Sequence, residues 1–175
     1  MIVVKEKSMC TGCYACFSAC PKQCISMIED EEGFCYPLAD ASNCINCGLC
    51  EKICPINKQE IESQHKRDID FLKSQESLIP EAYAVMNKNE EIRLKSSSGG
   101  MFTLLAEEIL LDGGYVFGAV MSEDCKSVYH IGTNKIEELE KLRGSKYLQS
   151  IIGNTYQQVK ELLKQDKRVL FSGTP

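Results

Sequence analysis

The chain has 175 residues, of which 43% are hydrophobic and 26% charged, and its formal net charge is -5 at pH 7. This composition is typical of a globular protein of one or two domains. The acidic balance and the lack of a basic stretch studded with aromatic residues argue against a nucleic-acid partner. No apolar stretch approaches the ~18 residues needed to span a bilayer. We therefore expect a soluble, cytoplasmic protein without a membrane span, in a compartment where thiols stay reduced.

Eight of the eleven cysteines form two copies of the motif C-x2-C-x2-C-x3-C-P, and the second copy follows the first by 34 residues. Three thiolates in one such turn can hold three corners of an iron–sulfur cubane, while the cysteine before the proline ligates the other cluster. The motifs therefore predict two [4Fe-4S] clusters. The expected ligands are Cys10, Cys13, Cys16 and Cys54 for the first cluster, and Cys44, Cys47, Cys50 and Cys20 for the second.

Zinc and disulfides explain this pattern less well. Zinc sites are typically built from pairs of cysteines, whereas each run here has three in succession and a Cys-Pro. A disulfide framework suits a small secreted domain, but residues 1–9 contain two lysines and no apolar run that could serve as a secretory signal. The double motif resembles that of bacterial two-cluster ferredoxins, which implies a small α+β ferredoxin-like dicluster domain folded around its clusters.

Three cysteines lie outside the motifs. We interpret Cys24 and Cys35 as small buried hydrophobic residues rather than as alternative ligands or part of a third site, because free cysteine is among the most buried residue types. Cys125, far downstream, is interpreted as incidental.

The composition along the chain predicts three segments. Residues 1–58 form the cluster domain, with an apolar step at 25–28 and a hairpin strand over 33–37 that ends at proline. Residues 59–80 form a polar linker, in which His65 is expected to be solvated. Residues 81–175 form a second domain of alternating strands and helices, which is the α/β pattern.

In this second domain, strands are predicted at 82–86, 115–121, 127–131 and 169–171, and helices at 101–111, 136–142 and 155–164. Phe102, Leu105 and Ile109 mark the expected buried face of the first helix, and the Gly113-Gly114 pair is expected to end it. His130, a lone histidine on a strand, is interpreted as structural. The chain stops just after the strand pattern at 169–171, which would leave an apolar edge uncovered. We therefore expect an incomplete α/β domain, the alternative being a natural chain that ends in an edge strand.

Three small polar loops that contain glycine stand at element ends: 96–100, 143–147 and 172–175. The first precedes a helix whose unpaired N–H groups could bind an anion, although the same residues could be a plain helix cap. The second offers two cations, a hydroxyl and an aromatic ring, or is simply a solvated turn. The third follows a strand at its carboxyl end, where open α/β sheets place ligands. The first loop matches neither the Walker motif nor the dinucleotide-binding glycine motif.

The sequences SSSGGMFT at 96–103, VFGA at 116–119, GSKYLQS at 144–150 and VLFSGTP at 169–175 resemble the beta subunit family of coenzyme F420 hydrogenase/dehydrogenase. Members of this family bind FAD and pass electrons between iron–sulfur clusters and the flavin, in some cases on to coenzyme F420. The resemblance implies that the second domain is a flavin-binding domain whose C-terminal part is absent. It implies flavin contacts from Ser97, Ser98, Gly99, Gly100, Gly144, Ser145, Lys146, Tyr147, Gly173, Thr174 and Pro175.

Two functions follow from this resemblance. The first is an iron–sulfur flavoprotein oxidoreductase that passes electrons between two [4Fe-4S] clusters and FAD, and on to coenzyme F420, ferredoxin or another acceptor. The second is a relay subunit without a substrate of its own, in a larger hydrogenase, dehydrogenase or polysaccharide-synthesis-associated complex. Both imply a redox partner protein, such as ferredoxin or a hydrogenase/dehydrogenase subunit. The residues identify no catalytic acid or base.

Overall fold

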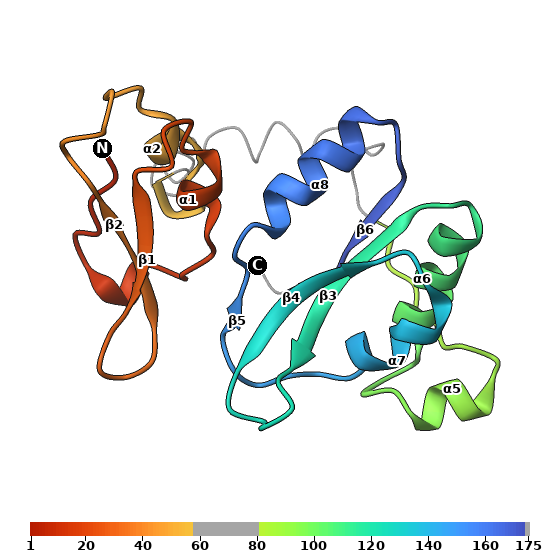
Figure 1. Ribbon diagram of the computed structural model, residues 1–175. Helices are drawn as coiled ribbons and strands as arrows, with labels where there is room; N and C mark the ends of the chain where they lie inside the picture. Colours follow the sequence, from red (N-terminus) through yellow and green to blue (C-terminus); the bar gives the residue numbers. More distant parts are fainter. Residues whose placement is uncertain (58–80, 174–175) are drawn as a thin grey trace. The chain divides into compact units, whose positions relative to one another are not determined.

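The chain folds as two units, Met1–Tyr83 and Ala84–Pro175. The computed structural model describes residues 1–57 and 81–173, and each unit is considered by itself (Figure 1). The polar linker predicted at 59–80, including His65, lies outside the described residues.

In the first unit, the repeat in the sequence is also a repeat in the backbone structure. After a short 3-10 helix, η1 (Lys7–Met9), the two cysteine motifs form helices α1 (Ala15–Ala19) and α2 (Leu49–Ile53), which contact each other. Each helix begins after a residue in the left-handed region, Tyr14 with φ 61° and Gly48 with φ 71°. The two helices are offset by the same 34 residues as the motifs.

A hairpin of two antiparallel strands completes this unit. Strand β1 (Ile25–Glu29) pairs with β2 (Cys35–Ala39), so that Met27 lies opposite Pro37. The prediction of a strand that ends at Pro37 is therefore wrong, because this proline lies in the middle of β2. A proline is tolerated there because both strands of a two-stranded sheet are edges, where one missing N–H donor costs little.

The second unit contains a four-stranded sheet in the order β5-β4-β3-β6. Its strands are β3 (Tyr115–Met121), β4 (Val128–Thr133), β5 (Ser150–Ile151) and β6 (Val169–Phe171). The central pair, β3 and β4, is antiparallel, whereas β6 on β3 and β5 on β4 are parallel. The α/β expectation thus needs correction to a mixed α+β arrangement. A turn of six residues joins β3 to β4, and a connection this short can join only antiparallel strands.

The helices of this unit are α5 (Glu90–Leu94), α6 (Met101–Leu111), α7 (Leu139–Leu142), preceded by η3 (Ile136–Glu138), and α8 (Thr155–Lys164). The bounds predicted for α6, α8, β3 and β6 are confirmed. The strand predicted at 82–86 is wrong, because residues 81–87 form no regular element and their side chains at Tyr83 and Met86 are exposed. No strand in the described part of the chain pairs with this segment.

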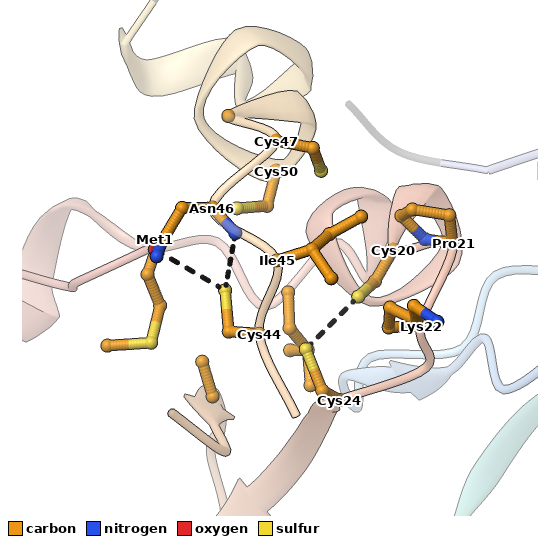
Figure 2. Close-up of a pocket in the computed structure, with 13 residues that line it drawn as sticks. Met1, Cys20, Pro21, Lys22, Cys24, Cys44, Ile45, Asn46, Cys47 and Cys50 are labelled. Carbon is orange, nitrogen blue, oxygen red and sulfur yellow. Dashed lines mark hydrogen bonds between the residues drawn. The ribbon is translucent and has the colours of Figure 1, made fainter. Parts of the chain in front are cut away.

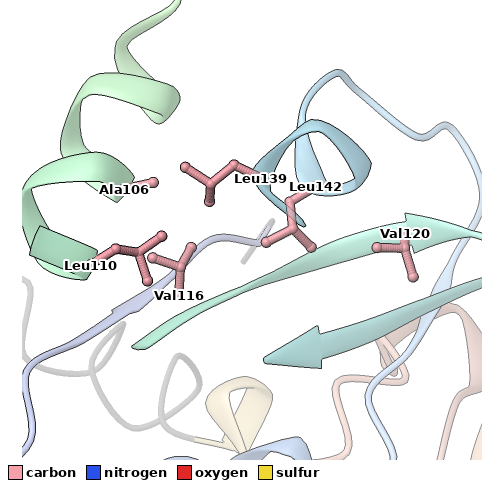
Figure 3. Close-up of a cluster of buried hydrophobic side chains, with 6 residues drawn as sticks. All are labelled: Ala106, Leu110, Val116, Val120, Leu139 and Leu142. Atoms are coloured by element: carbon pink, nitrogen blue, oxygen red, sulfur yellow. The ribbon is translucent and has the colours of Figure 1, made fainter. Parts of the chain in front are cut away.

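The core of the second unit lies between β3 and the helices α6 and α7 (Figure 3). Its buried side chains are Ala106, Leu110, Val116, Val120, Leu139 and Leu142. Helix α8 contacts β4 and β6 instead, and its Tyr156 stacks on Phe171 with the ring centroids 5.3 Å apart.

The buried face of α6 differs in part from the predicted one. Phe102 and Ile109 pack against the core as predicted, but Leu105 is half exposed. The stripe is completed by Thr103, Ala106 and Leu110, which follow helical spacing. The helix ends as predicted at its glycine pair: Gly113 has φ 72°, and its N–H donates to the Leu110 carbonyl. No helix within residues 1–57 and 81–173 is long and apolar enough to cross a membrane.

Candidate functional site

The four thiols predicted to hold the first cluster line one pocket of the first unit. Cys10, Cys13 and Cys16 reach it from the first motif, and Cys54 reaches it from the second. The pocket has a volume of about 540 Å³, and Ile2 and Tyr14 also line it. The fold therefore brings the Cys-Pro cysteine of one motif to the three clustered cysteines of the other, which is the crossed arrangement that the spacing predicts.

The four thiols predicted to hold the second cluster line a second, narrower pocket of about 20 Å³ (Figure 2). Cys44, Cys47 and Cys50 come from the second motif, and Cys20 comes from the first. Cys24 also lines this pocket. No three Cys, His, Asp or Glu side chains in the described residues are placed to hold a single metal ion. The thiols are instead distributed around two pockets, and this donor set fits two clusters.

Backbone N–H groups point at the cysteine sulfurs in both motifs. The Gly12 N–H donates to the Cys10 sulfur, and the Asn46 N–H donates to Cys44 Sγ across 3.4 Å. Gly12 and Asn46 occupy matching positions of the repeat and share a left-handed backbone, with φ 60° and 52°. This conformation turns the chain back over the sulfur, and donors of this kind stabilise the negative charge of a thiolate ligand.

Burial acts in the opposite direction on the same thiols. It raises the pKa of Cys10, and it raises the pKa of Cys16 to about 11. Cys16 and Cys50 are buried next to Ile2 and Ile25, so that thiols make up much of the small core of this unit. Ligands of this kind must lose their protons when iron binds, and the binding energy then contributes to folding.

Cys24 is buried, as the sequence predicted, but its thiol contacts another thiol and does not only pack against apolar side chains. Its Sγ lies 3.4 Å from Cys20 Sγ. This hydrogen bond, together with burial, raises the pKa of the Cys24 thiol to about 11. Cys35 lies on β2, beside Tyr14, and Cys125 is exposed in the turn after β3. No sequence pattern indicates the Cys20–Cys24 contact, because loop residues four apart face each other only when the backbone turns back.

In the second unit, two of the three predicted loops meet. Ser97 Oγ accepts a hydrogen bond of 2.7 Å from the Ser145 N–H. Gly144 lies beside the same hydroxyl and has φ 84°. Arg143 Nε donates to Thr103 Oγ1 across 3.1 Å, which ties the second loop to α6. The loops at 96–100 and 143–147 therefore form one structural element, although 48 residues separate the two serines.

Lys146 and Tyr147 of the second loop differ in their surroundings. Lys146 Nζ donates to the carbonyls of Lys141, Leu142 and Arg143, at 3.1, 3.0 and 2.9 Å. Its ammonium thus satisfies the last carbonyls of α7. The neighbouring Tyr147 side chain is 93% exposed.

The backbone conformation and packing of the first loop require its two glycines, independently of any ligand. A Cβ on Gly99 would lie 2.8 Å from the Val85 carbonyl oxygen, and Gly100 has φ 74°. Gly100 is the N-cap of α6, which has no side-chain cap. The first-turn N–H groups of this helix therefore remain as donors for a ligand or for water. Ser98 belongs to the same loop.

The third loop is held by His130. Its Nε2 lies 3.0 Å from the Ser172 carbonyl oxygen, and its Nδ1 lies 2.6 Å from Ser150 Oγ. A carbonyl can only accept, so Nε2 carries the proton and Nδ1 accepts from the Ser150 hydroxyl. The ring stacks on Phe171, with centroids 5.2 Å apart, and burial lowers its pKa. His130 thus joins β4, β5 and the end of β6. Gly173 follows directly, and Thr174 and Pro175 lie outside the described residues.

Two families match the chain. The family described as "4Fe-4S dicluster domain" matches residues 9–58, and the one described as "Coenzyme F420 hydrogenase/dehydrogenase, beta subunit N-term" matches residues 82–154.

Of the relatives that the chain resembles, two are ferredoxins by name and one is named as a subunit of NADH-quinone oxidoreductase. An uncharacterized ferredoxin of Methanocaldococcus jannaschii is 34% identical over 55 residues, which are 31% of this chain and 70% of that protein. NADH-quinone oxidoreductase subunit I 2 of Geobacter metallireducens is 32% identical over 82 residues, 41% of this chain and 63% of the subunit. Ferredoxin 7Fe of Hydrogenibacillus schlegelii is 32% identical over 79 residues, 41% of this chain and 95% of that ferredoxin.

The crossed cysteine pockets and these matches define the class of the protein, which is an iron–sulfur electron-transfer protein with a ferredoxin-type dicluster domain. Residues 82–154 match the coenzyme F420 hydrogenase/dehydrogenase beta subunit family that the loop motifs suggested, and the dicluster domain precedes this region in the chain.

Proposed function

We propose that this protein is an iron–sulfur flavoprotein oxidoreductase that passes electrons between two [4Fe-4S] clusters and FAD, and on to coenzyme F420, ferredoxin or another acceptor. The observation that carries this proposal is the division of eight thiols between two pockets, each with three cysteines of one motif and the Cys-Pro cysteine of the other. This division supports a pair of clusters within one small domain, and clusters of this type exchange single electrons.

The proposed ligands are Cys10, Cys13, Cys16 and Cys54 for the first cluster, and Cys44, Cys47, Cys50 and Cys20 for the second. The residues around them bury the sulfurs and donate hydrogen bonds to them, which are two of the means by which proteins set a cluster potential. In this proposal residues 1–58 carry the electrons, residues 59–80 connect, and residues 81–175 bind the flavin.

Three features of the second unit support a flavin site. The first turn of α6 is uncapped, the Ser97–Ser145 contact joins two loops at that helix start, and the Tyr147 ring is free to stack. A bound flavin would pair single electrons into two-electron transfer. Lys146 takes part in this site by fixing the second loop to α7. Gly173 belongs to this proposed site as part of the third loop, which His130 holds through the Ser172 carbonyl.

The flavin proposal is tested on the full-length gene product, rebuilt with its clusters under anaerobic conditions. FAD binding is measured by equilibrium dialysis, and the complex is then mixed with reduced coenzyme F420 while the flavin and cluster absorbance is followed. The proposal expects bound FAD and bleaching of both flavin and clusters. Bound FAD that only reduced ferredoxin can reduce keeps the flavoprotein and excludes coenzyme F420 as its donor. A protein that binds no FAD contradicts the proposal.

A second candidate is a relay subunit with no substrate of its own. The likeness to a protein named as a subunit of NADH-quinone oxidoreductase favours it. A relay needs clusters and a redox partner protein but no flavin. The same dialysis experiment therefore separates the two candidates, because a relay subunit holds two clusters, binds no FAD and co-purifies with its partner.

A further inference from the structure

The pocket of the second cluster contains one thiol more than a cubane requires. Cys20, Cys44, Cys47 and Cys50 are its four proposed ligands, and Cys24 is the fifth thiol (Figure 2). The Cys24 side chain is only 9% exposed, and its Sγ lies 3.4 Å from Cys20 Sγ, within hydrogen-bond distance for two sulfur atoms.

The backbone holds Cys24 in this position. Gln23, with φ 50°, turns the chain back, and its N–H donates to the Cys20 carbonyl across 3.1 Å. The Cys24 carbonyl accepts a bond of 2.7 Å from the Asp40 N–H, next to the end of β2. Cys24 directly precedes β1, so both sides of this residue are fixed. Its thiol therefore faces Cys20 because of the fold.

The chemistry of the pair is asymmetric. Cys20 acts as a thiolate when it ligates iron, and its sulfur already accepts hydrogen bonds from the backbone N–H groups of Cys24, Lys22 and Gln23. A thiolate cannot donate, whereas a thiol that does not ligate retains its proton and can. The Cys20–Cys24 contact is then an S–H···S hydrogen bond from Cys24 to the ligand. Reduction adds negative charge to the cluster and its sulfurs, so a donor stabilises the reduced state more than the oxidised state.

We propose that Cys24 is a positioning residue that raises the reduction potential of the second cluster through this S–H···S hydrogen bond to Cys20. The proposal rests on the ligand assignment given under the proposed function. It extends that assignment by making the two clusters inequivalent.

The internal repeat confines this effect to one cluster. Cys54 matches Cys20 in the second motif copy, and the residue that matches Cys24 is Lys58. The first cluster therefore has no corresponding thiol four residues after its Cys-Pro ligand. In this protein the first cluster serves as the internal reference for any change made at position 24.

The test compares the full-length, cluster-loaded protein with its Cys24→Ala and Cys24→Ser variants, and with Cys125→Ala as a control for the loss of a remote thiol. Iron and sulfide are counted first, and the two potentials are then measured by redox titration followed by electron paramagnetic resonance. We expect full iron content throughout. In Cys24→Ala the equilibrium constant for reducing one cluster should fall threefold to tenfold, where tenfold is about 59 mV for a one-electron couple.

Serine keeps a donor at this position, so Cys24→Ser should retain most of the wild-type potential, and Cys125→Ala should match the wild type. Unchanged potentials in Cys24→Ala, or equal shifts of both clusters, would overturn the proposal. Loss of about half of the iron in Cys24→Ala would also overturn it, because Cys24 would then be a ligand. A wild-type protein that assembles no iron–sulfide clusters contradicts the proposed function as well, and this is decided by the iron and sulfide count before any potential is measured.

Discussion

At the scale of single residues, the crossed ligand arrangement makes a prediction that differs from that of a cluster held by one motif alone. Cys54 belongs to the second motif but lines the pocket of the first cluster. We expect Cys54→Ser and Cys13→Ser to abolish the same cluster and to leave about four irons per chain. Iron analysis and the spectrum of the reduced protein check this. If the two variants lost different clusters, the crossed assignment would be wrong. Cys125→Ser, in an exposed turn, is the matched control.

His130 makes the stability of the second unit depend on pH. Burial lowers its pKa below the ordinary value of 6.5, although the hydrogen bond to the Ser172 carbonyl opposes the shift. The folded state therefore binds fewer protons than the unfolded state around this pH. The stabilisation is fully present above pH 6.5 and is lost as the pH falls from there toward the lowered folded-state pKa.

We expect the free energy of unfolding to fall as the pH drops below about 6.5, and His130→Phe to remove this dependence while keeping an aromatic ring beside Phe171. The substitution should also lower the free energy of unfolding by about 1–3 kcal/mol, because two hydrogen bonds are lost. Denaturant unfolding at several pH values measures both effects. The chain has one other histidine, so His65→Gln is the control. An unchanged pH dependence in His130→Phe would exclude His130 as its source.

At the scale of elements, substitution of Lys146 tests whether this residue caps helix α7 or binds the flavin phosphates. Two of its three hydrogen bonds end on α7 carbonyls, and the third ends on the carbonyl of Arg143, the C-cap of this helix. We expect Lys146→Met to lower stability by about 0.5–1 kcal/mol and to weaken FAD binding only to the extent that the loop loosens. Lys141→Met, on the same helix, should change neither quantity. A variant of full stability that loses most of its FAD affinity would instead assign Lys146 to the flavin phosphates.

The sheet offers a matched pair of glycines. A Cβ on Gly132 would lie 2.3 Å from the Phe117 ring, because the two residues are paired across β3 and β4. A Cβ on Gly118 would meet Leu142 at 3.6 Å, an ordinary contact. We therefore expect Gly132→Ala to destabilise the unit by about 1–3 kcal/mol. Gly118→Ala should change its melting temperature little. Equal effects in calorimetry would contradict this account of the packing.

The elements that could be predicted from the sequence are those with a strong local pattern. The spans of α6 and α8 have helical periodicity, and β3 and β6 are short apolar runs bounded by polar residues. Residues 82–86 have the same apolar character, but a strand needs a partner, and none of the described strands pairs with them. Strand β5 was missed because two residues, Ser150 and Ile151, carry no pattern, and only the pairing with β4 defines them.

At the scale of the whole molecule, the candidate sites divide in the same way. The cysteine pockets could be predicted because the spacing of the ligands is itself the geometric constraint. The junction of Ser97 with Ser145 and the Cys20–Cys24 contact could not, because each depends on how separate turns fold onto each other.

The two units have separate cores, one rich in thiols and one aliphatic. We therefore expect the first unit to depend on its clusters for folding far more than the second.

This difference can be measured by chelation. Removing iron from the full-length protein should unfold the first unit and leave the second folded, because metal binding energy contributes to the stability of a domain with little apolar core. Hydrogen exchange before and after chelation resolves the two units. Protection lost equally in both units, or in neither, would contradict this view.

The central claim is that residues 1–58 hold two [4Fe-4S] clusters on eight crossed cysteines. The most direct test is the content of iron, acid-labile sulfide and zinc in the full-length protein purified without oxygen. The account predicts about eight irons and about eight sulfides per chain, with no stoichiometric zinc. Zinc without sulfide, or only about four irons, would contradict it.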